Sequence, residues 1–339
     1  MRKRWAKLWR PGLGVVIGIV ILVGCGAVGH SRLSASGGAG DAMPEVAAAV
    51  LDDGEKLRVV ATTSIVADVV AQVAGDRVVL TRLMPLGADP HAFEPTPRDI
   101  AAVSEAHIIF SNGVGLETFI EGLLQAAGQD ALIVPVSYGI DLLPFEDAHE
   151  DAGMRDDAVH EDEHEADPHV WFDPNNVIVW VDNIQTTLVA LDPDNAAAYE
   201  ANATAYLEAL EALDEWIRQQ VEDVPQERRK LVTDHASLTY FATAYDFEQV
   251  GVVIPGASTL AEPSAQHVSA LIRTIEAENV PAVFIGRTVN PQLTRQIAGD
   301  SGAELVLLYT GSLSDADEPA ATYVEFMRYN VNAIAEALR

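Results

Sequence analysis

Short apolar runs alternate with amphipathic stretches along the chain from Leu57 onward. In the first half, runs rich in Val, Ile and Leu predict buried strands at 57–64, 77–85, 106–113 and 131–137. Stretches of helical period lie between them at 64–75 and 115–128. The second half repeats the design, with strands expected at 230–235, 247–256, 282–288 and 304–310 and helices at 263–279 and 290–302. Such strand–helix repeats predict an α/β fold with a mostly parallel sheet, flanked by helices, in each half.

The segment between the two halves predicts one long helix. Residues 194–222 contain no Gly and no Pro, and at the usual helical rise they would extend about 43 Å. Apolar side chains recur there at spacings of four and three, at Tyr199, Ala203, Tyr206, Leu210, Leu213, Ile217 and Val221. Asp192 and Pro193 precede them as an N-cap and first-turn pair.

An ordinary long helix on a single domain would carry the same apolar stripe. The position of this helix between two βα halves instead favours a rigid link between two lobes. The expected organisation is a first lobe at 57–191, the linking helix at 192–224 and a second lobe at 225–339.

The first 24 residues have the features of a secretion signal. Five basic residues and no acidic ones lead into an apolar run that is too short for a comfortable membrane span and stops at Cys25. The stretch LVGC resembles a bacterial lipobox, in which the cysteine becomes the first mature residue and carries the lipid. The alternative is an uncleaved anchor helix with an incidental cysteine. Residues 25–56, rich in Gly, Ala and Ser, predict a flexible tether.

Acidic residues dominate the charge of the chain. The net charge is −30, and removing the five basic residues of 1–24 leaves −35 for the mature chain. Such a chain binds nucleic acid poorly and is repelled by anionic lipid. The acidity attracts cations in general but specifies no ligand, and solubility alone would explain it. Cys25 is the only cysteine, which excludes an internal disulfide.

One acidic run contains histidines as well. Residues 146–167 hold eleven acidic residues, one arginine and the histidines His149, His160 and His164. This composition cannot bury enough apolar surface to order itself, so a loop is expected. Two interpretations stay open: a solvated spacer, or a low-affinity collector of metal ions for a site nearby.

Three other histidines share a local setting. His91 follows a predicted strand and precedes a helix, His169 also precedes a helix, and His235 lies at the carboxyl end of a strand. Ligands of open α/β sheets bind outside the carboxyl ends of the strands, and neutral imidazole is a good ligand for Zn²⁺ and related ions. Each histidine taken singly could equally be packed or lie beside a helix cap. The remaining histidines are assigned to the tether (His30), a strand start (His107) and a solvated helix face (His267).

Four stretches carry a resemblance to a known family. ADPHAFEPTPRDI, DPHVWFDPNN, VTDHASLTYFATAY and the central helix are similar to the metal-binding lipoproteins of zinc and manganese ABC importers, over about residues 57–338. The resemblance implies two α/β lobes joined by a long helix, with the metal in the cleft between them. It implies His91 and His169 as ligands from the first lobe and His235 from the second. It also implies a lipid-anchored, extracytoplasmic, non-enzymatic monomer that delivers its ion to an ABC permease.

The chain departs from the family pattern at one position. Many relatives have a carboxylate near the end of the last strand, where this chain has Gly311. Glu262, Asp315, Asp317 or a water molecule are the candidates for the fourth ligand. Loss of a hard oxygen ligand leaves a site rich in imidazole, which favours Zn²⁺, with Mn²⁺ or iron as the alternative cargo of the same importer class.

Two other functions, catalysis and adhesion, are alternatives to metal delivery. Three histidines plus an open position also suit a zinc hydrolase, but the sequence contains no HExxH motif to supply a general base. Adhesion to a host or surface polymer is the other, and nothing in the sequence requires it.

Overall fold

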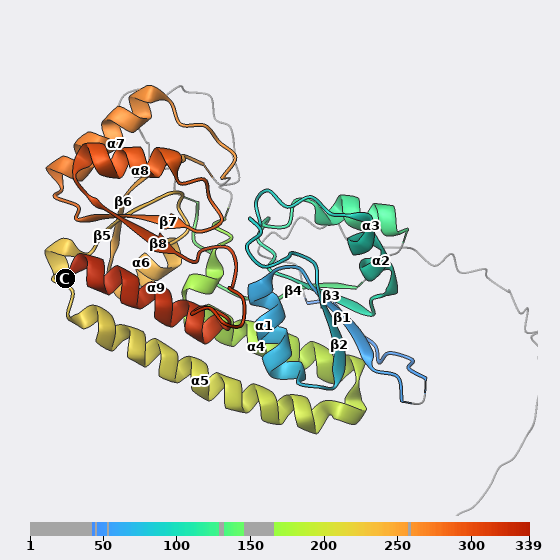
Figure 1. Ribbon diagram of the computed structural model, residues 1–339. Coiled ribbons are helices and arrows are strands. Elements are labelled where there is room, and N and C mark those ends of the chain that lie inside the picture. Colours follow the sequence, from blue (N-terminus) through green and yellow to red (C-terminus); the bar gives the residue numbers. More distant parts are fainter. Residues whose placement is uncertain (1–42, 45, 53, 129–131, 146–165, 257–258) are drawn as a thin grey trace, which may run out of the picture. The chain divides into compact units, whose positions relative to one another are not determined.

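The computed structural model describes residues 43–339 except 45, 53, 129–131, 146–165 and 257–258 (Figure 1). Among them, no helix is long and apolar enough to cross a membrane. The secretion signal, the lipidation site at Cys25, most of the tether and the three histidines of the acidic run lie outside the described residues.

Two four-stranded parallel sheets form the framework (Figure 1). The first contains β1 (Leu57–Ala61), β2 (Val78–Arg82), β3 (Ile108–Ser111) and β4 (Ile133–Pro135), in the order β2-β1-β3-β4. The second contains β5 (Lys230–Thr233), β6 (Glu248–Val252), β7 (Ala282–Gly286) and β8 (Glu304–Leu308), in the order β6-β5-β7-β8. The predicted α/β class, with a parallel sheet in each half, is confirmed.

Both sheets have the same topology, and this places the ligand-binding ends. In the first sheet β2 lies on one side of β1 and the later strands β3 and β4 lie on the other side, so the strand order switches between β1 and β3. The second sheet has the same switch between β5 and β7. Loops diverge at such a switch point and leave a crevice outside the carboxyl ends of the strands. The central strands β3 and β7 are buried along their whole length, because helices cover both faces of each sheet.

The helices follow the apolar periodicity of the sequence. In the first half they are α1 (Ser64–Ala74), α2 (Pro97–Glu105), α3 (Ile120–Ala127) and α4 (Pro174–Leu191). In the second half they are α6 (Thr239–Tyr245), α7 (Ala265–Ala277), α8 (Gln292–Ser301) and α9 (Tyr323–Leu338). The short 3₁₀ turns are η1 (Val170–Phe172), η2 (Pro193–Asn195) and η3 (Gln226–Arg228).

One predicted helix begins later than expected. The periodicity at 115–128 predicts a helix from Gly115, but α3 begins at Ile120. Val114 and Gly115 have φ values of 54° and 74°. The chain there is left-handed and cannot continue as a right-handed helix.

The long helix α5 spans Ala196–Glu222, which is 27 residues. Its buried side chains are the seven apolar residues that the spacing predicts, from Tyr199 to Val221. The start differs from the prediction: α4 runs to Leu191, Asp192 ends it, and η2 forms a tight corner before α5. Asp192 does not cap α5, because its carboxylate accepts hydrogen bonds from Tyr199 Oη (2.7 Å) and Asn195 Nδ2 (2.8 Å).

A continuous apolar core joins the two halves. Helix α5 packs against α1 and α4 of the first half and against α9 of the second (Figure 1). Helix α9 also contacts α1, and the Tyr323 backbone N–H, at the start of α9, donates to Asp68 of α1 (2.9 Å). The largest core cluster contains strand residues of both sheets, such as Val59 and Phe284. The loops that follow the strands are therefore held on one framework.

The stripe of α5 predicts where this framework is sensitive. Leu210→Ala removes a fully buried side chain and should lower the free energy of unfolding by about 2–5 kcal/mol. Glu211→Ala, at the neighbouring exposed position, should change it by less than about 0.5 kcal/mol. Urea denaturation of the two variants measures both values, and equal losses would contradict the assigned helix face.

Candidate metal centre

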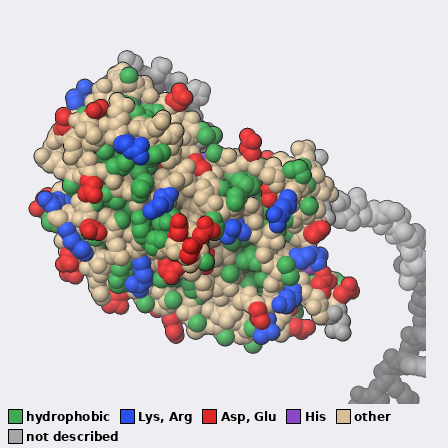
Figure 2. Space-filling model, viewed as in Figure 1, with side chains coloured by type: hydrophobic (Ala, Val, Ile, Leu, Met, Phe, Trp, Pro, Cys, Tyr) green, Lys and Arg blue, Asp and Glu red, His purple; other side chains and the backbone are tan. Residues whose placement is uncertain are grey.

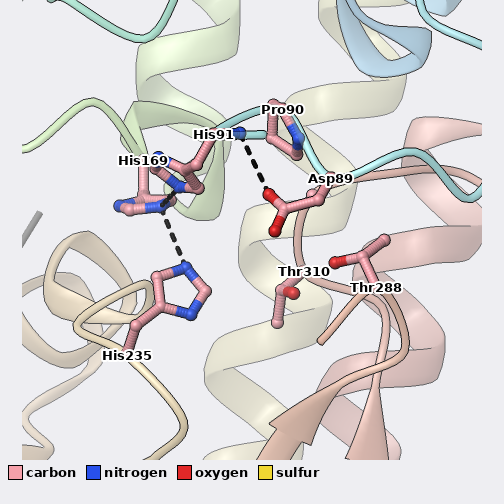
Figure 3. Close-up of a pocket in the computed structure, with 8 residues that line it drawn as sticks. Asp89, Pro90, His91, His169, His235, Thr288 and Thr310 are labelled. Carbon is pink, nitrogen blue, oxygen red and sulfur yellow. Dashed lines mark hydrogen bonds between the residues drawn. The ribbon is translucent and has the colours of Figure 1, made fainter. Parts of the chain in front are cut away.

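Three imidazoles from distant parts of the chain meet at one point (Figure 3). His91 comes from the loop after β2, His169 immediately precedes η1, and His235 follows β5. The His169 Nε2 atom lies 3.1 Å from His91 Nε2 and 3.2 Å from His235 Nε2. His169 and His235 are buried and His91 is half-buried. Within the described chain, this is the one group of three or more His, Cys, Asp or Glu side chains arranged to hold a metal ion.

His169 is fixed by the aspartate two residues before it. The buried Asp167 carboxylate accepts hydrogen bonds from the His169 backbone N–H (2.9 Å) and from His169 Nδ1 (2.7 Å). Pro168 lies between them, and its carbonyl accepts a hydrogen bond from Asn112 Nδ2 (3.1 Å). Because the ring donates its Nδ1 proton to Asp167, the Nε2 lone pair is left free to bind a cation.

His235 is fixed in the same way by its neighbour. One Asp234 oxygen accepts from the His235 backbone N–H (2.8 Å) and from His235 Nδ1 (2.9 Å). The other oxygen accepts from the Gly286 N–H at the end of β7 (2.8 Å). The second imidazole is thus tied to two adjacent strands of its sheet, again with Nε2 pointing away from the carboxylate.

His91 is held through its backbone rather than its ring. Asp89 Oδ1 accepts from the His91 N–H (3.0 Å), and Asp89 Oδ2 accepts from the Thr259 hydroxyl (2.6 Å). The Asp89 carboxylate therefore shapes the loop and ties it to the second half of the chain. No carboxylate holds the ring of His91, so the orientation of this ring is less constrained than that of His169 or His235.

A buried glutamate, which sequence analysis did not identify, fixes the loop after β3, and Asn112 of this loop contacts the His169 segment at Pro168. Glu117 accepts hydrogen bonds from the Thr62 hydroxyl (2.6 Å) and from the backbone N–H groups of Asn112 (2.6 Å) and Gly113 (3.0 Å). Burial raises the pKa of Glu117 despite these donors. The stretch 114–124 contains two acidic residues among apolar ones, Glu117 and Glu121, and only the fold shows that Glu117 is the buried one.

The protonation of the three imidazoles differs. Burial, reinforced by the other two imidazoles, lowers the pKa of His91 to about 2. Burial also lowers the pKa of His169, although Asp167 opposes the shift. Burial acts in the same direction on His235, but the adjacent Asp234 carboxylate outweighs it, and the pKa of His235 is raised. Two of the three rings are therefore neutral over the physiological pH range, and His235 is the ring that binds a proton most readily.

The spacing of the three rings suits a transition-metal ion. Nitrogen ligands about 2.0–2.1 Å from a tetrahedral Zn²⁺ lie about 3.3–3.4 Å from each other. The observed Nε2 separations of 3.1 and 3.2 Å are close to this value. The Nε2 lone pairs face one another, and a cation between them would convert their mutual repulsion into three attractive contacts.

The structure does not bring the three candidate carboxylates to the imidazoles. Glu262, Asp315 and Asp317 are exposed, and none of them lines the pocket that contains the histidines. Gly311 does line it, with Asp89, Pro90, Thr288 and Thr310. The position expected to carry a carboxylate in relatives therefore faces the site and offers no ligand in this chain.

The two remaining described histidines have structural contacts. His107 accepts a hydrogen bond from the Arg58 N–H through Nδ1 (2.9 Å), in agreement with a structural role. The prediction of a solvated face for His267 is wrong: the residue is buried, with Nε2 2.9 Å from the Val252 carbonyl oxygen. Helix α7 turns this side chain toward β6, a tertiary contact that local polarity does not reveal.

Comparison with known proteins identifies relatives along most of the chain. The family model described as "Zinc-uptake complex component A periplasmic" matches residues 59–337. The manganese-binding lipoprotein MntA of Halalkalibacterium halodurans is 36% identical over 288 residues, which cover 85% of this chain and 90% of the relative. The metal ABC transporter substrate-binding lipoprotein SsaB of Streptococcus sanguinis is 32% identical over 293 residues, covering 84% and 90%.

Solved structures show the same similarity. The Mn-bound periplasmic metal binding protein of candidatus liberibacter asiaticus matches with a TM-score of 0.72 and 28% identity, over 84% of this chain and all of that one. The periplasmic zinc binding protein TroA of Treponema pallidum matches with a TM-score of 0.72 and 29% identity, over 84% and 99%. The chain therefore belongs to the zinc-uptake complex component A family, the extracytoplasmic metal-binding lipoproteins that serve ABC importers.

Proposed function

We propose that this protein captures one divalent transition-metal ion through His91, His169 and His235 and delivers it to an ABC permease. The observation that carries the proposal is the convergence of three Nε2 atoms, two of them on rings oriented by buried carboxylates. A carboxylate behind an imidazole fixes its tautomer and strengthens it as a metal ligand. The ligands come from both halves of the chain, so a bound ion bridges the two sheets.

Manganese is the first candidate for the cargo. The MntA lipoprotein with 36% identity is named as a manganese-binding protein, and a lipoprotein of Streptococcus gordonii with 31% identity is named as part of a manganese ABC transporter. One of the similar solved structures is described as Mn-bound. These names support manganese, the alternative drawn from the sequence, better than zinc, the main expectation. Zinc is the second candidate for one specific reason: the ligand set on the protein is three imidazoles without a carboxylate, and such a set suits Zn²⁺.

Attachment to the membrane rests on the sequence before the described residues. We propose that Cys25 carries the lipid and that the residues after it serve as a tether. The end of the predicted tether 25–56 is packed on the core instead: the Ala49 backbone N–H donates to the Leu191 carbonyl oxygen (2.8 Å), and Met43, Val46 and Leu51 contact the same core. A random-coil tether of about 18 residues before Met43 would span roughly 23 Å on average. The folded part could then move near a permease without leaving the membrane surface.

The ligand assignment predicts a strong loss of affinity in three single variants. Replacing His91, His169 or His235 by Ala removes one of few metal–nitrogen bonds. Each change should weaken Zn²⁺ binding by more than about 100-fold, since loss of an orienting partner alone costs about 10–100-fold. Isothermal titration calorimetry on metal-free protein measures the change.

His107→Ala is the matched control, because this histidine lies outside the cluster. It should keep full affinity and one bound ion per chain. Unchanged affinity in any of the three ligand variants would remove that residue from the site.

The identity of the cargo needs a measurement on protein from its own cells. Nitrogen ligands bind Zn²⁺ more tightly than Mn²⁺ in general, so a preference for Zn²⁺ in purified protein would not identify the natural ion. Protein recovered without chelators or added metal, from cells grown with both ions, should contain about one equivalent of manganese. One equivalent of zinc would support the second candidate and overturn the first.

The pKa shifts predict how metal binding depends on pH. A raised pKa of His235 means that one proton must leave as the ion binds. Affinity should therefore be constant above that pKa and fall about tenfold per pH unit below it, starting above the usual histidine value of about 6.5. His91 and His169 have lowered pKa values and should not contribute in this range.

Asp234→Asn provides the comparison. It removes the carboxylate that raises the pKa of His235, so the fall in affinity should begin at a lower pH. The affinity at high pH should drop by about 10–100-fold, because the ring loses its orienting acceptor. Identical pH profiles for the variant and the natural protein would rule out His235 as the competing group.

A further inference from the structure

The metal pocket has two walls of different chemistry. Figure 3 shows the three imidazoles on one side and Asp89, Thr288 and Thr310 facing them across the pocket. The imidazoles supply three nitrogen donors, and a tetrahedral ion takes four ligands while an octahedral ion takes six. The further donors must therefore come from the second wall or from solution.

The second wall contains a single carboxylate, that of Asp89. Gly311 has no side chain, and a Cβ added there would lie 2.7 Å from Pro90 Cδ and 3.1 Å from Pro90 Cγ. The proline ring thus fills the space that a side chain at position 311 would need. Both Asp89 oxygens already accept hydrogen bonds, one from His91 and one from Thr259.

Thr310 is the buried polar side chain of this wall that has no partner among the described residues. It is 3% exposed, and its hydroxyl oxygen has no hydrogen-bond partner among the described residues. A buried hydroxyl in that condition costs free energy unless something bonds to it. The carbonyl of the same residue accepts from Trp171 Nε1 (3.0 Å), so the backbone around this hydroxyl is held in place.

A second cavity adjoins the pocket at Thr310. It has a volume of about 170 Å³ and shares Thr288 and Thr310 with the metal pocket. Arg287 also lines it, with its guanidinium stacked 4.7 Å from the centre of the Tyr309 ring and no ion pair to a described carboxylate. Asp315 and Glu318 line the same cavity; both are exposed, and Glu318 accepts from the Tyr309 hydroxyl (3.0 Å).

We propose that the coordination of the metal is completed from solution by a small oxygen donor that enters through this cavity and is held by Thr310. The donor is a water molecule or a small carboxylate, and it takes the place of the protein carboxylate that is missing at Gly311. The second cavity has room for it, Thr310 lines both spaces and offers a buried hydroxyl without a hydrogen-bond partner, and Arg287 attracts the carboxylate form. The inference rests on the proposed function, since it requires the three histidines to bind the ion.

Water proton relaxation tests the proposal with Mn²⁺ as the probe. A water molecule that is bound to Mn²⁺ and exchanges with solvent shortens the relaxation time of bulk water, whereas an ion saturated by protein ligands has little effect. The full-length protein with one Mn²⁺ should show the strong effect, and acetate should reduce it in a saturable way. A weak effect that acetate does not change would overturn the proposal while leaving the metal site intact. Failure to bind Mn²⁺ and Zn²⁺ at all would instead overturn the proposed function.

Variants of the second wall separate the sources of the donor. Arg287→Gln should weaken the acetate effect about two- to fivefold, the loss expected for one exposed charged contact, without changing the signal from water. Arg273→Gln, at an exposed position on α7, is the matched control and should change neither. An equal acetate effect in natural protein and Arg287→Gln would overturn entry through this cavity.

A last pair of variants asks whether the protein can supply the donor itself. Gly311→Asp combined with Pro90→Ala introduces a carboxylate and removes the ring that blocks it. This variant should lose the response to acetate and show a smaller water signal, because one carboxylate replaces one solvent donor; Pro90→Ala alone is its reference. Asp89→Asn covers the remaining possibility: a water signal that appears only in this variant would identify Asp89 as the donor and overturn the proposal.

Discussion

The site depends on two buried pairs of carboxylate and imidazole. Asp167 holds His169 and Asp234 holds His235, each through the backbone N–H and the ring Nδ1 of the histidine. Burial of a carboxylate costs free energy unless hydrogen-bond donors surround it. Here the donors are the backbone N–H and ring Nδ1 of His169 and His235, the two residues whose imidazoles must be oriented. The cost of burial is offset by hydrogen bonds that also set the direction of both Nε2 lone pairs. The candidate ligands are therefore oriented before any ion binds.

The fold explains why such pairs can be buried. His235 follows a central strand at the switch point of its sheet, where Asp234 can also accept from the neighbouring strand at Gly286. His169 has no strand directly before it and relies on Asn112 and Glu117 after β3. The apolar core that links both sheets through α5 and α9 keeps these separate supports in register. A small displacement of either sheet would separate the nitrogen atoms and weaken the site.

The second wall of the pocket, at Gly311 and Pro90, determines how many ligands the protein itself can offer to an ion. Close packing of Pro90 on Gly311 brings the His91 loop against the second half of the chain and leaves no space for a side chain ligand. The bond between Thr259 and Asp89 adds a second tie at the same place. One relative is named as a manganese-binding protein and one similar solved structure as a zinc-binding protein, and three imidazoles with further oxygen donors are compatible with either ion.

The sequence by itself determined the parallel α/β class, the long helix with its seven buried residues and the three histidines singled out as candidates, because these follow from apolar periodicity and local motifs. Their role as ligands stays a prediction. Tertiary structure alone decided that the imidazoles lie 3.1 and 3.2 Å apart, that Glu117 fixes the loop after β3 and that His267 is buried. It also placed Glu262, Asp315 and Asp317 away from the pocket and Gly311 against Pro90. Periodicity reports which face of an element is buried, whereas the meeting of loops 66 to 78 residues apart depends on how the sheets pack, which no local pattern encodes.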